Sequence, residues 1–190
     1  MKDLTKQRVA VSGIAGSFSE EAGLIYAGRD HIDPEFVFAT DMHGVLQAIH
    51  DGTAEVGVFP VVNSRGGLVH SAFKAMGEFT FQMKDEIWLE VHQCLLAQTS
   101  LDKSEIKKVV SHPQAIAQCE RYLRRELPHA ELVHWDDTAK AAQDLAVGKF
   151  DEHTAVIAPA RSAHIYGLDI IQKGIHDNHP NLTTFIVVTK

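Results

Sequence analysis

Short apolar runs alternate with helix-forming segments along this chain, and the same order occurs twice. In the first half, strands are expected at 8–12, 35–39 and 56–60, and helices at 17–29, 41–52 and 68–76. In the second half, strands are expected at 108–111, 131–135 and 154–158, and helices at 113–125, 136–148 and 159–167. An extended stretch at 86–97 joins the halves, and a strand rich in β-branched residues is expected at 183–189. This repeated pattern predicts an α/β protein with two lobes, each built on a mostly parallel sheet.

The carboxyl ends of the expected strands carry polar and flexible residues. These segments are 13–19, 60–67, 111–114 and 136–138. Pro60 is expected to end its strand, because proline lacks the N–H that a sheet ladder requires. In parallel α/β sheets, ligands bind beyond the carboxyl ends of the strands. The pattern therefore predicts one cleft lined by side chains from both lobes.

Composition disfavours several classes of function. The 190-residue chain has a formal net charge of -7, whereas general nucleic-acid binding depends on Lys and Arg. It contains no apolar run near the ~20 residues that a membrane span needs. Its polar start lacks the apolar core of a signal peptide, so a cytoplasmic location is expected. Cys94 and Cys119, without a C-x-x-C pattern, predict neither a disulfide framework nor a structural zinc site.

Several common catalytic motifs are absent from the sequence. It has no G-x-S-x-G, no G-x-x-x-x-G-K-[ST] and no H-E-x-x-H, and residues 13–16 are not a full dinucleotide fingerprint. Nucleophilic, nucleotide-driven and zinc-hydrolytic chemistry therefore have no support. The segment 176–179 places four possible metal ligands in a row, but in a loop without helical spacing, so we expect no metal site.

Two segments of the first half could bind an anion. Ser17 and Ser19 lie around a helix N-terminus, where hydroxyls and backbone N–H groups favour a carboxylate, although a plain helix cap is the commoner case. Asn63 could orient a hydroxyl or carboxylate, and Arg65 could neutralise one. The alternative is a glycine-containing turn with a solvated arginine.

Two later segments offer acid–base groups. Ser111 is expected to cap the following helix with Gln114 as its capping-box partner, and His112 could act as an acid or base, although a structural histidine is the commoner case. Thr183 and Thr184 open the last expected strand. A threonine hydroxyl assists a leaving oxygen only where a dry site and neighbouring donors support it, and otherwise these are two β-branched strand residues.

Seven segments, in this order, resemble motifs of the prephenate dehydratase catalytic domain. The segments at 16–19, 58–64 and 92–96 are similar to G-[ST]-[FY]-[ST], V-x-P-x-E-N-S and H-C-L-L. The segments at 111–119 and 137–142 are similar to S-H-P-Q-A with a following Q-C and to S-T-A-x-A-A. The segments at 155–168 and 181–185 are similar to an A-x-I-A and Y-G-L region and to N-x-T-R-F. Each motif is short, but their order and spacing from about Arg8 to Val188 are specific.

The resemblance implies two lobes like those of a type II periplasmic binding protein, with the active site between them. The last strand would return to the first lobe, which gives a first lobe of 1–90 plus 176–190 and a second lobe of 91–175. We also expect no metal or organic cofactor, and a homodimer or larger oligomer. Because the sequence ends at Lys190, no ACT regulatory domain is expected.

The family's reaction converts prephenate to phenylpyruvate with loss of water and carbon dioxide, in phenylalanine biosynthesis; arogenate is the other substrate considered. The resemblance implies that Thr183 assists the leaving hydroxyl, with Asn63 and Gln114 as its catalytic partners. The implied substrate-binding residues are Ser17, Ser19, Ser64, Arg65, Ser111, His112, Thr138, Thr184 and Phe185.

Three positions depart from these motifs. Val62 replaces the acid, Thr184 replaces the arginine, and Gln93 replaces the histidine beside Cys94. Valine carries no charge, and threonine cannot bind a carboxylate as arginine does. Arg65 could supply a replacement charge. Two alternatives therefore stay open: a lyase like prephenate decarboxylase, and a non-catalytic module that binds small carboxylates.

Overall fold

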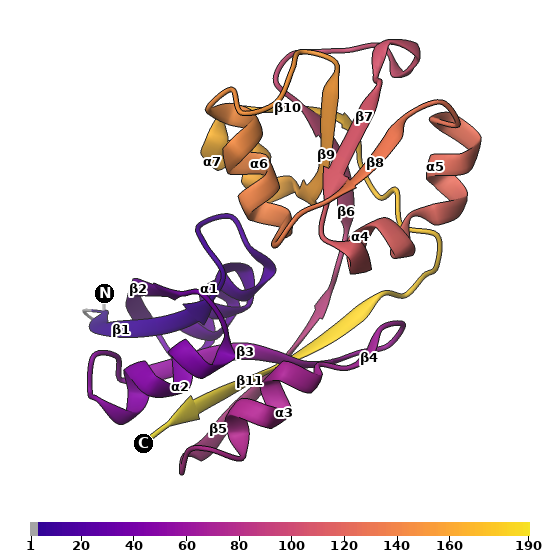
Figure 1. Cartoon of the computed structure of the whole chain (residues 1–190). Coiled ribbons are helices and arrows are strands. Elements are labelled where there is room, and N and C mark those ends of the chain that lie inside the picture. The colour runs from indigo at the N-terminus through magenta and orange to yellow at the C-terminus, as the bar shows by residue number, and fades with distance from the viewer. Residues whose placement is uncertain (1–3) are drawn as a thin grey trace. The chain divides into compact units, whose positions relative to one another are not determined.

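The structure is a computed structural model that describes residues 4–190, and the chain forms two compact units (Figure 1). Unit 1 contains residues 4–14, Phe18–Glu90 and Leu182–Lys190, and unit 2 contains Ala15–Ser17 and Val91–Asn181. The sequence analysis assigned 176–181 to the first lobe, whereas the structure groups this segment with unit 2. The cause is local hydrogen bonding: the backbone N–H of Asp177, for example, donates to the carbonyl of Gln118.

Unit 1 is a mixed sheet with helices on both faces. Its elements are β1 (Thr5–Ser12), α1 (Phe18–Arg29), β2 (Ile32–Ala39), α2 (Met42–His50), β3 (Val56–Asn63), β4 (Gly67–Leu68), α3 (His70–Met76), β5 (Gln82–Glu90) and β11 (Leu182–Thr189). The strand order is β2-β1-β3-β11-β5, with β4 paired to β3. β1 runs parallel to β2 and β3, and β11 runs antiparallel to β3 and β5.

Apolar side chains divide between the two faces of this sheet. One cluster joins the sheet to α1 and includes Val9, Tyr26 and Phe185. The other joins it to α2 and α3 and includes Leu46 and Ile186. Alternate residues of a strand thus bury apolar surface on opposite sides, as expected for a sheet covered on both faces.

Unit 2 repeats this arrangement. Its elements are β6 (Gln93–Ala97), a 3₁₀ turn (Lys103–Glu105), β7 (Lys108–Ser111), α4 (Pro113–Gln118), α5 (Glu120–Glu126), β8 (Glu131–His134), α6 (Thr138–Ala146), β9 (Thr154–Pro159), α7 (Ala160–Tyr166) and β10 (Asp169–Gln172). The strand order is β10-β6-β9-β7-β8, and β7 is parallel to both of its neighbours. The predicted α/β class with two parallel-rich sheets is confirmed.

Three details of the predicted elements were wrong. The helix expected at 113–125 is two helices, α4 and α5, which meet at Cys119. The stretch at 86–97 is not one strand but contains the end of β5 and all of β6. β3 also continues through Pro60, because this residue lies beyond the pairing with β1 and next to a register shift against β11. Both are places where a missing N–H is tolerated.

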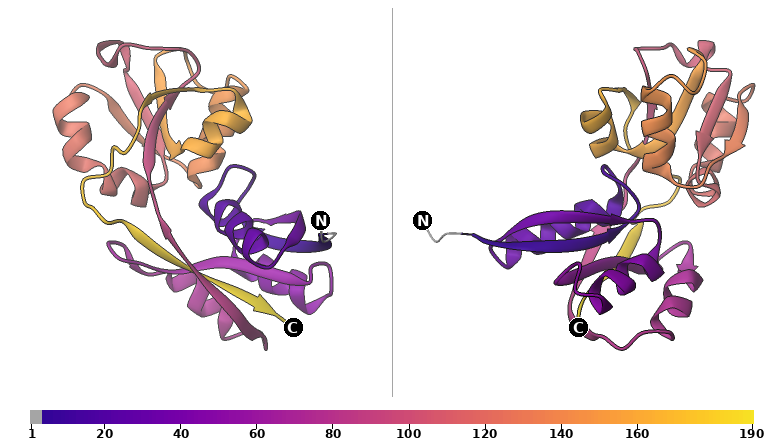
Figure 2. Two further views of the ribbon diagram at one scale, coloured as in Figure 1. Left: turned by 180° about the vertical axis from the view of Figure 1, so that it is seen from behind. Right: turned by 60° about the vertical axis from the view of Figure 1, so that its left-hand side comes forward.

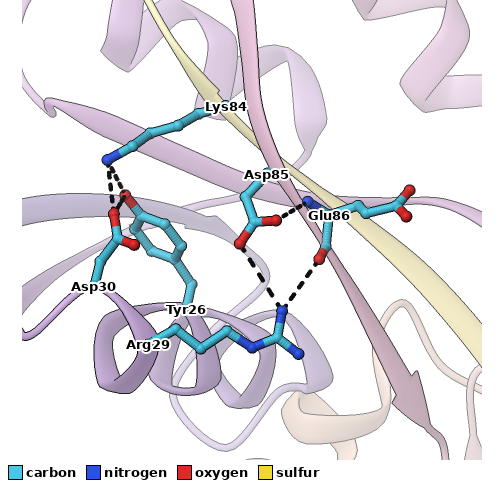
Figure 3. Close-up of polar contacts among 6 residues, drawn as sticks. All are labelled: Tyr26, Arg29, Asp30, Lys84, Asp85 and Glu86. Atoms are coloured by element: carbon cyan, nitrogen blue, oxygen red, sulfur yellow. Dashed lines mark hydrogen bonds and ion pairs between the residues drawn. The ribbon is translucent and has the colours of Figure 1, made fainter.

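The edge strand β5 is tethered to α1 by polar side chains (Figure 3). Lys84 is the extra residue of a bulge against β11, and its ammonium donates to the Tyr26 hydroxyl (2.6 Å) and pairs with Asp30 (2.8 Å). Arg29 lies 3.9 Å from the Asp85 carboxylate. Charges and a bulge on an edge strand disfavour edge-to-edge association, so this side of the sheet is protected.

Two segments connect the units, one between β5 and β6 and one that leads into β11 (Figure 2). Glu90, at the end of β5, is the strand partner of Leu182, at the start of β11. One residue further along, the Val91 N–H donates to the Asn181 carbonyl (2.7 Å). Within residues 4–190, no helix is both long and apolar enough to cross a membrane.

Candidate functional site

The side chains of Asn63 and Thr183 meet in unit 1. They are cross-strand partners at the end of β3 and the start of β11, and both are buried. Asn63 Nδ2 donates to Thr183 Oγ1 at 2.8 Å. Asn63 Oδ1 accepts from the backbone N–H groups of Arg65 (2.8 Å) and Gly66 (2.7 Å). These two donors can face only the amide oxygen, so they fix the orientation of the amide and aim its NH₂ group at the threonine.

A β-bulge places Asn63 on the same side of the sheet as Thr183. The register between β3 and β11 passes from Phe185–Pro60 to Thr184–Val62, so Val61 has no partner in β11. Without this extra residue, strand alternation would turn Asn63 to the other face. Bulges of this kind re-aim side chains, and this one brings together two residues 120 positions apart.

Ser64 and Arg65 complete the turn after β3. The backbone N–H of Ser64 donates to the Leu182 carbonyl (2.8 Å), and the Ser64 hydroxyl accepts from the Leu182 N–H (3.0 Å). Ser64 thereby holds the start of β11 against the turn. Arg65 is exposed, next to the Asn63–Thr183 pair in the chain. The structure thus brings four of the predicted residues together in unit 1.

The segment after β7 differs from its prediction. Ser111 is fully buried, and its hydroxyl donates to the Ile157 carbonyl at 2.6 Å. It does not cap α4; instead, His112 is the N-cap and its Nδ1 accepts from the Gln114 N–H (3.2 Å). Ser111 is the last residue of β7, and its binding of substrate stays a prediction. Gln114 lies in the first turn of α4 and is exposed.

Thr138 opens α6 at the same edge of the unit 2 sheet. Ser111 and His134, the last residues of the parallel strands β7 and β8, are strand partners, so α4 and α6 begin close to adjacent strand ends. Asp137 is the N-cap of this helix, and its carboxylate accepts from the Lys140 N–H (2.9 Å). Thr138 is half-buried in the first turn.

Ser17 and Ser19 belong to different units. The Ser19 hydroxyl lies 2.9 Å from the Ser12 hydroxyl in unit 1, and both are buried. Ser17 belongs to a segment of unit 2 that α7 holds in place. There, the Ser162 hydroxyl donates to the Gly16 carbonyl (3.0 Å), and the Tyr166 hydroxyl donates to the Ala15 carbonyl (2.6 Å).

Gly16 is required at this position. Its φ is +87°, and a Cβ would lie 2.8 Å from the Ser162 hydroxyl oxygen. The sequence analysis missed the contributions of Ser162 and Tyr166. Its only signal for this region was the similarity of Tyr166-Gly167-Leu168 to a family motif.

A second polar network, also missed from sequence, lies where unit 2 meets its connections. Gln118 Oε1 accepts from Gln93 Nε2 (3.1 Å) and from Asn181 Nδ2 (3.1 Å). Asn181 is also hydrogen-bonded to Val91 through its side chain (3.3 Å) and its carbonyl (2.7 Å). Gln93, noted above as a departure from a motif, therefore has a structural use here.

Comparison with known proteins agrees with the motifs. The family model described as "Prephenate dehydratase" matches residues 9–190. The chain belongs to the prephenate dehydratase family.

Relatives in this family include plant enzymes and a solved bacterial structure. The chain is 36% identical over 183 residues to arogenate dehydratase/prephenate dehydratase 6 of Arabidopsis thaliana, covering 96% of this chain and 43% of the relative. It is 35% identical over 183 residues to arogenate dehydratase 1 of Petunia hybrida, covering 96% and 42%. It therefore spans less than half the length of these relatives. A crystal structure of prephenate dehydratase from Arthrobacter aurescens, in complex with L-Phe, superposes with a TM-score of 0.87 at 26% identity, covering 96% of this chain and 60% of that one.

Two residues expected to bind substrate in the prephenate dehydratase family are enclosed here. The Phe185 ring is 2% exposed and packs in the cluster under α1. Thr184 is buried as well, and its strand partners are Val62 and Trp88. Neither side chain is part of the Asn63–Thr183 contact.

Asp177, the two histidines beside it and Cys119 also carry groups that could react. The Asp177 carboxylate accepts from the backbone N–H groups of Arg121 (2.7 Å) and Tyr122 (3.0 Å). His176 Nε2 and His179 Nδ1 lie 3.0 Å apart. Residues 4–190 contain no group of three or more His, Cys, Asp or Glu arranged to hold a metal. Burial raises the pKa of the Cys119 thiol well above its ordinary range, so this thiol stays protonated at neutral pH and is a poor nucleophile.

Proposed function

We propose that this chain is a dehydratase acting on prephenate, with arogenate as the alternative substrate. Prephenate would lose water and carbon dioxide to give phenylpyruvate, a step in phenylalanine synthesis. The observation that carries the proposal is the hydrogen bond from Asn63 Nδ2 to Thr183 Oγ1. The threonine oxygen receives a hydrogen bond there, which leaves its own proton for another acceptor.

The proposed chemistry uses this proton. The C4–oxygen bond of prephenate breaks, and the hydroxyl leaves as water after taking the Thr183 proton. The bond from the ring to its carboxylate also breaks, carbon dioxide departs, and the electron pair of that bond completes the aromatic ring. Thr183 then regains a proton from solvent. Aromatisation supplies the driving force, so the protein has only to orient the substrate and stabilise the departing oxygen.

Asn63 would act on Thr183 and not on the substrate ring. Its NH₂ group stabilises negative charge that develops on the threonine oxygen as the proton leaves. Because two backbone N–H groups hold the amide oxygen, the NH₂ group needs no reorientation during the reaction. This preorganisation is what makes such a donor effective.

Other predicted residues enter the proposal as substrate ligands. Gln114 and His112 would orient the substrate, and Arg65 would neutralise a carboxylate. Hydroxyl and backbone donors for the carboxylates would come from Ser17, Ser19, Ser64 and Thr138. Ser111 and Phe185 are buried and make core contacts, and their binding of substrate stays a prediction. A homodimer or larger assembly and a cytoplasmic location stay predictions, and light scattering tests the first.

One assay separates the candidate functions. The purified protein is incubated with prephenate and, separately, with arogenate, while aromatic product and remaining substrate are both measured. Phenylpyruvate from prephenate, or phenylalanine from arogenate, supports the dehydratase. Loss of substrate without aromatic product supports the decarboxylase-like lyase. Binding without loss supports the non-catalytic module and contradicts our proposal.

A further inference from the structure

Neighbouring residues of β11 face opposite sides of the unit 1 sheet. Phe185 and Val187 belong to the apolar cluster under α1, whereas Ile186 and Val188 belong to the cluster under α2 and α3. Since alternation continues along the strand, Thr183 lies on the α1 side and Thr184 on the other. Their strand partners on β5 agree: Thr183 pairs with Leu89 of the α1 cluster, and Thr184 pairs with Trp88.

Thr184 is part of an uncharged row that crosses four strands. Leu68 of β4 is the partner of Val62 in β3, Val62 is the partner of Thr184 in β11, and Thr184 is the partner of Trp88 in β5. Val62 packs against the cluster under α2 and α3. Of the inner pair, Thr184 is 8% exposed and Val62 is partly buried, whereas the end residues Leu68 and Trp88 are 54% and 58% exposed.

The bulge connects this row to the Asn63–Thr183 contact. Val61 and Val62 are consecutive, yet both contact the cluster under α2 and α3. Two consecutive residues on one face are the expected result of a bulge, and the next residue, Asn63, is turned to the opposite face. The register of the Val62–Thr184 pair therefore decides whether Asn63 and Thr183 meet.

We propose that Val61, Val62 and Thr184 are positioning residues that lock the register of β3 against β11 from the face opposite Asn63 and Thr183. Neither Val62 nor Thr184 contacts the substrate. Val62 and Thr184, the two departures from the family motifs, then replace one charged cross-strand pair with an uncharged pair. The chemistry of Thr183 is retained. This inference rests on the proposed function for its kinetic consequences, but its structural consequence stands apart from activity.

The energetics of charge at this pair give the proposal a direct test. One charged side chain here would lie beside apolar neighbours without a partner, which destabilises the fold. Opposite charges placed directly across two antiparallel strands would instead interact with each other. The family motifs carry an acid and an arginine at these two positions, so the double variant with Val62→Glu and Thr184→Arg restores their pair.

The experiment compares wild type, Val62→Glu, Thr184→Arg and the double variant. We measure the urea midpoint of unfolding, and kcat and KM with prephenate and arogenate. Each single variant should lower the unfolding midpoint and reduce kcat by roughly tenfold to a hundredfold, with KM nearly unchanged, because misplaced groups slow the chemical step. The double variant should recover both the midpoint and kcat beyond the sum of the single effects.

Two outcomes would overturn the inference. Additive effects in the double variant would show that the pair is not coupled. A lower KM in Thr184→Arg alone would show that position 184 reaches the substrate. If wild type turns over neither substrate, the proposed function fails, while the unfolding midpoints still decide whether the pair is coupled.

A matched pair of uncharged variants guards against misfolding of the charged ones. Thr183→Val and Thr184→Val remove the same hydroxyl from neighbouring residues on opposite faces of β11. Thr183→Val should abolish most turnover, and Thr184→Val should reduce kcat far less. Equal losses would contradict the assignment of Thr184 to the positioning face.

Discussion

Two side-chain amides, Asn63 in unit 1 and Gln118 in unit 2, are each held by a small hydrogen-bond network. The Asn63 oxygen accepts two backbone N–H groups, and its NH₂ group donates to the Thr183 hydroxyl. The Gln118 oxygen accepts from the side-chain NH₂ groups of Gln93 and Asn181. Both arrangements satisfy polar groups that would be costly to bury alone.

The difference lies in the group at the end of each network. A hydroxyl can pass its proton to a leaving oxygen, so the Asn63 network can take part in acid catalysis. Amide NH₂ groups do not release protons in proteins, so the Gln118 network has no proton to pass to a leaving group. Changes in the Asn63 network should therefore lower kcat more than stability, and changes in the Gln118 network should lower stability more than kcat. The experiments below test that contrast.

Replacement of the Thr183 hydroxyl should have the largest effect. Thr183→Val keeps the β-branched shape but removes the proton, and kcat should fall by about 10²–10⁴-fold, the usual contribution of a general acid. Steady-state kinetics with prephenate and arogenate measure the change, and circular dichroism confirms the fold. Thr183→Ser is the matched control and should retain much of the activity. Equal activity in Thr183→Val and wild type would exclude the hydroxyl from the chemistry.

Asn63→Asp should have the next largest effect. The carboxylate can still accept from Arg65 and Gly66, but it cannot donate to Thr183, and it offers the threonine proton a competing acceptor. We expect kcat to fall by roughly tenfold to a thousandfold, as for loss of one preorganised donor, with little change in the urea midpoint. A loss of stability without a loss of kcat would mean that Asn63 is structural, like Gln118.

Gln118→Met should show the reverse balance. It leaves the NH₂ groups of Gln93 and Asn181 without this acceptor, and the free energy of unfolding should fall by ~1–3 kcal/mol. Urea unfolding measures this loss. Well below the unfolding temperature, kcat should change less than in Asn63→Asp. A larger kinetic effect than that of Asn63→Asp would break the contrast between the two networks.

The smallest effect is expected from Asp30, which lies in neither network. Lys84, and then Tyr26, hold the pKa of the Asp30 carboxyl below its ordinary value through hydrogen bonds (Figure 3). A carboxyl with a lowered folded-state pKa contributes stability above its unfolded pKa, and this contribution is lost as pH falls through the folded pKa. Asp30→Asn should therefore lower stability slightly at neutral pH and give a shallower decline in acid. Urea unfolding at several pH values measures both proteins. The prediction is wrong if Asp30→Asn and wild type lose stability equally as the pH falls.

Local order in the fold was predictable from sequence. The helices α1 and α2 and the β-branched strand β11 lie close to the ranges expected from sequence, since such elements depend on residues near one another in the chain. The family followed from the order and spacing of seven short motifs, and the pairing of interest, Asn63 with Thr183, lies within two of them. Errors concerned side chains whose partners are remote, such as Ser111, which bonds Ile157.

The sequence by itself determined the kinds of element, their order and the chemical groups that the proposed chemistry needs, because each depends on neighbours within a few residues. Tertiary structure decided which face each group occupies. Register between strands far apart in the chain, together with the bulge at Val61, turns Asn63 toward Thr183 and leaves Val62 and Thr184 on the other side. A shift of one residue reverses every side chain of a strand, and no local pattern records such a shift.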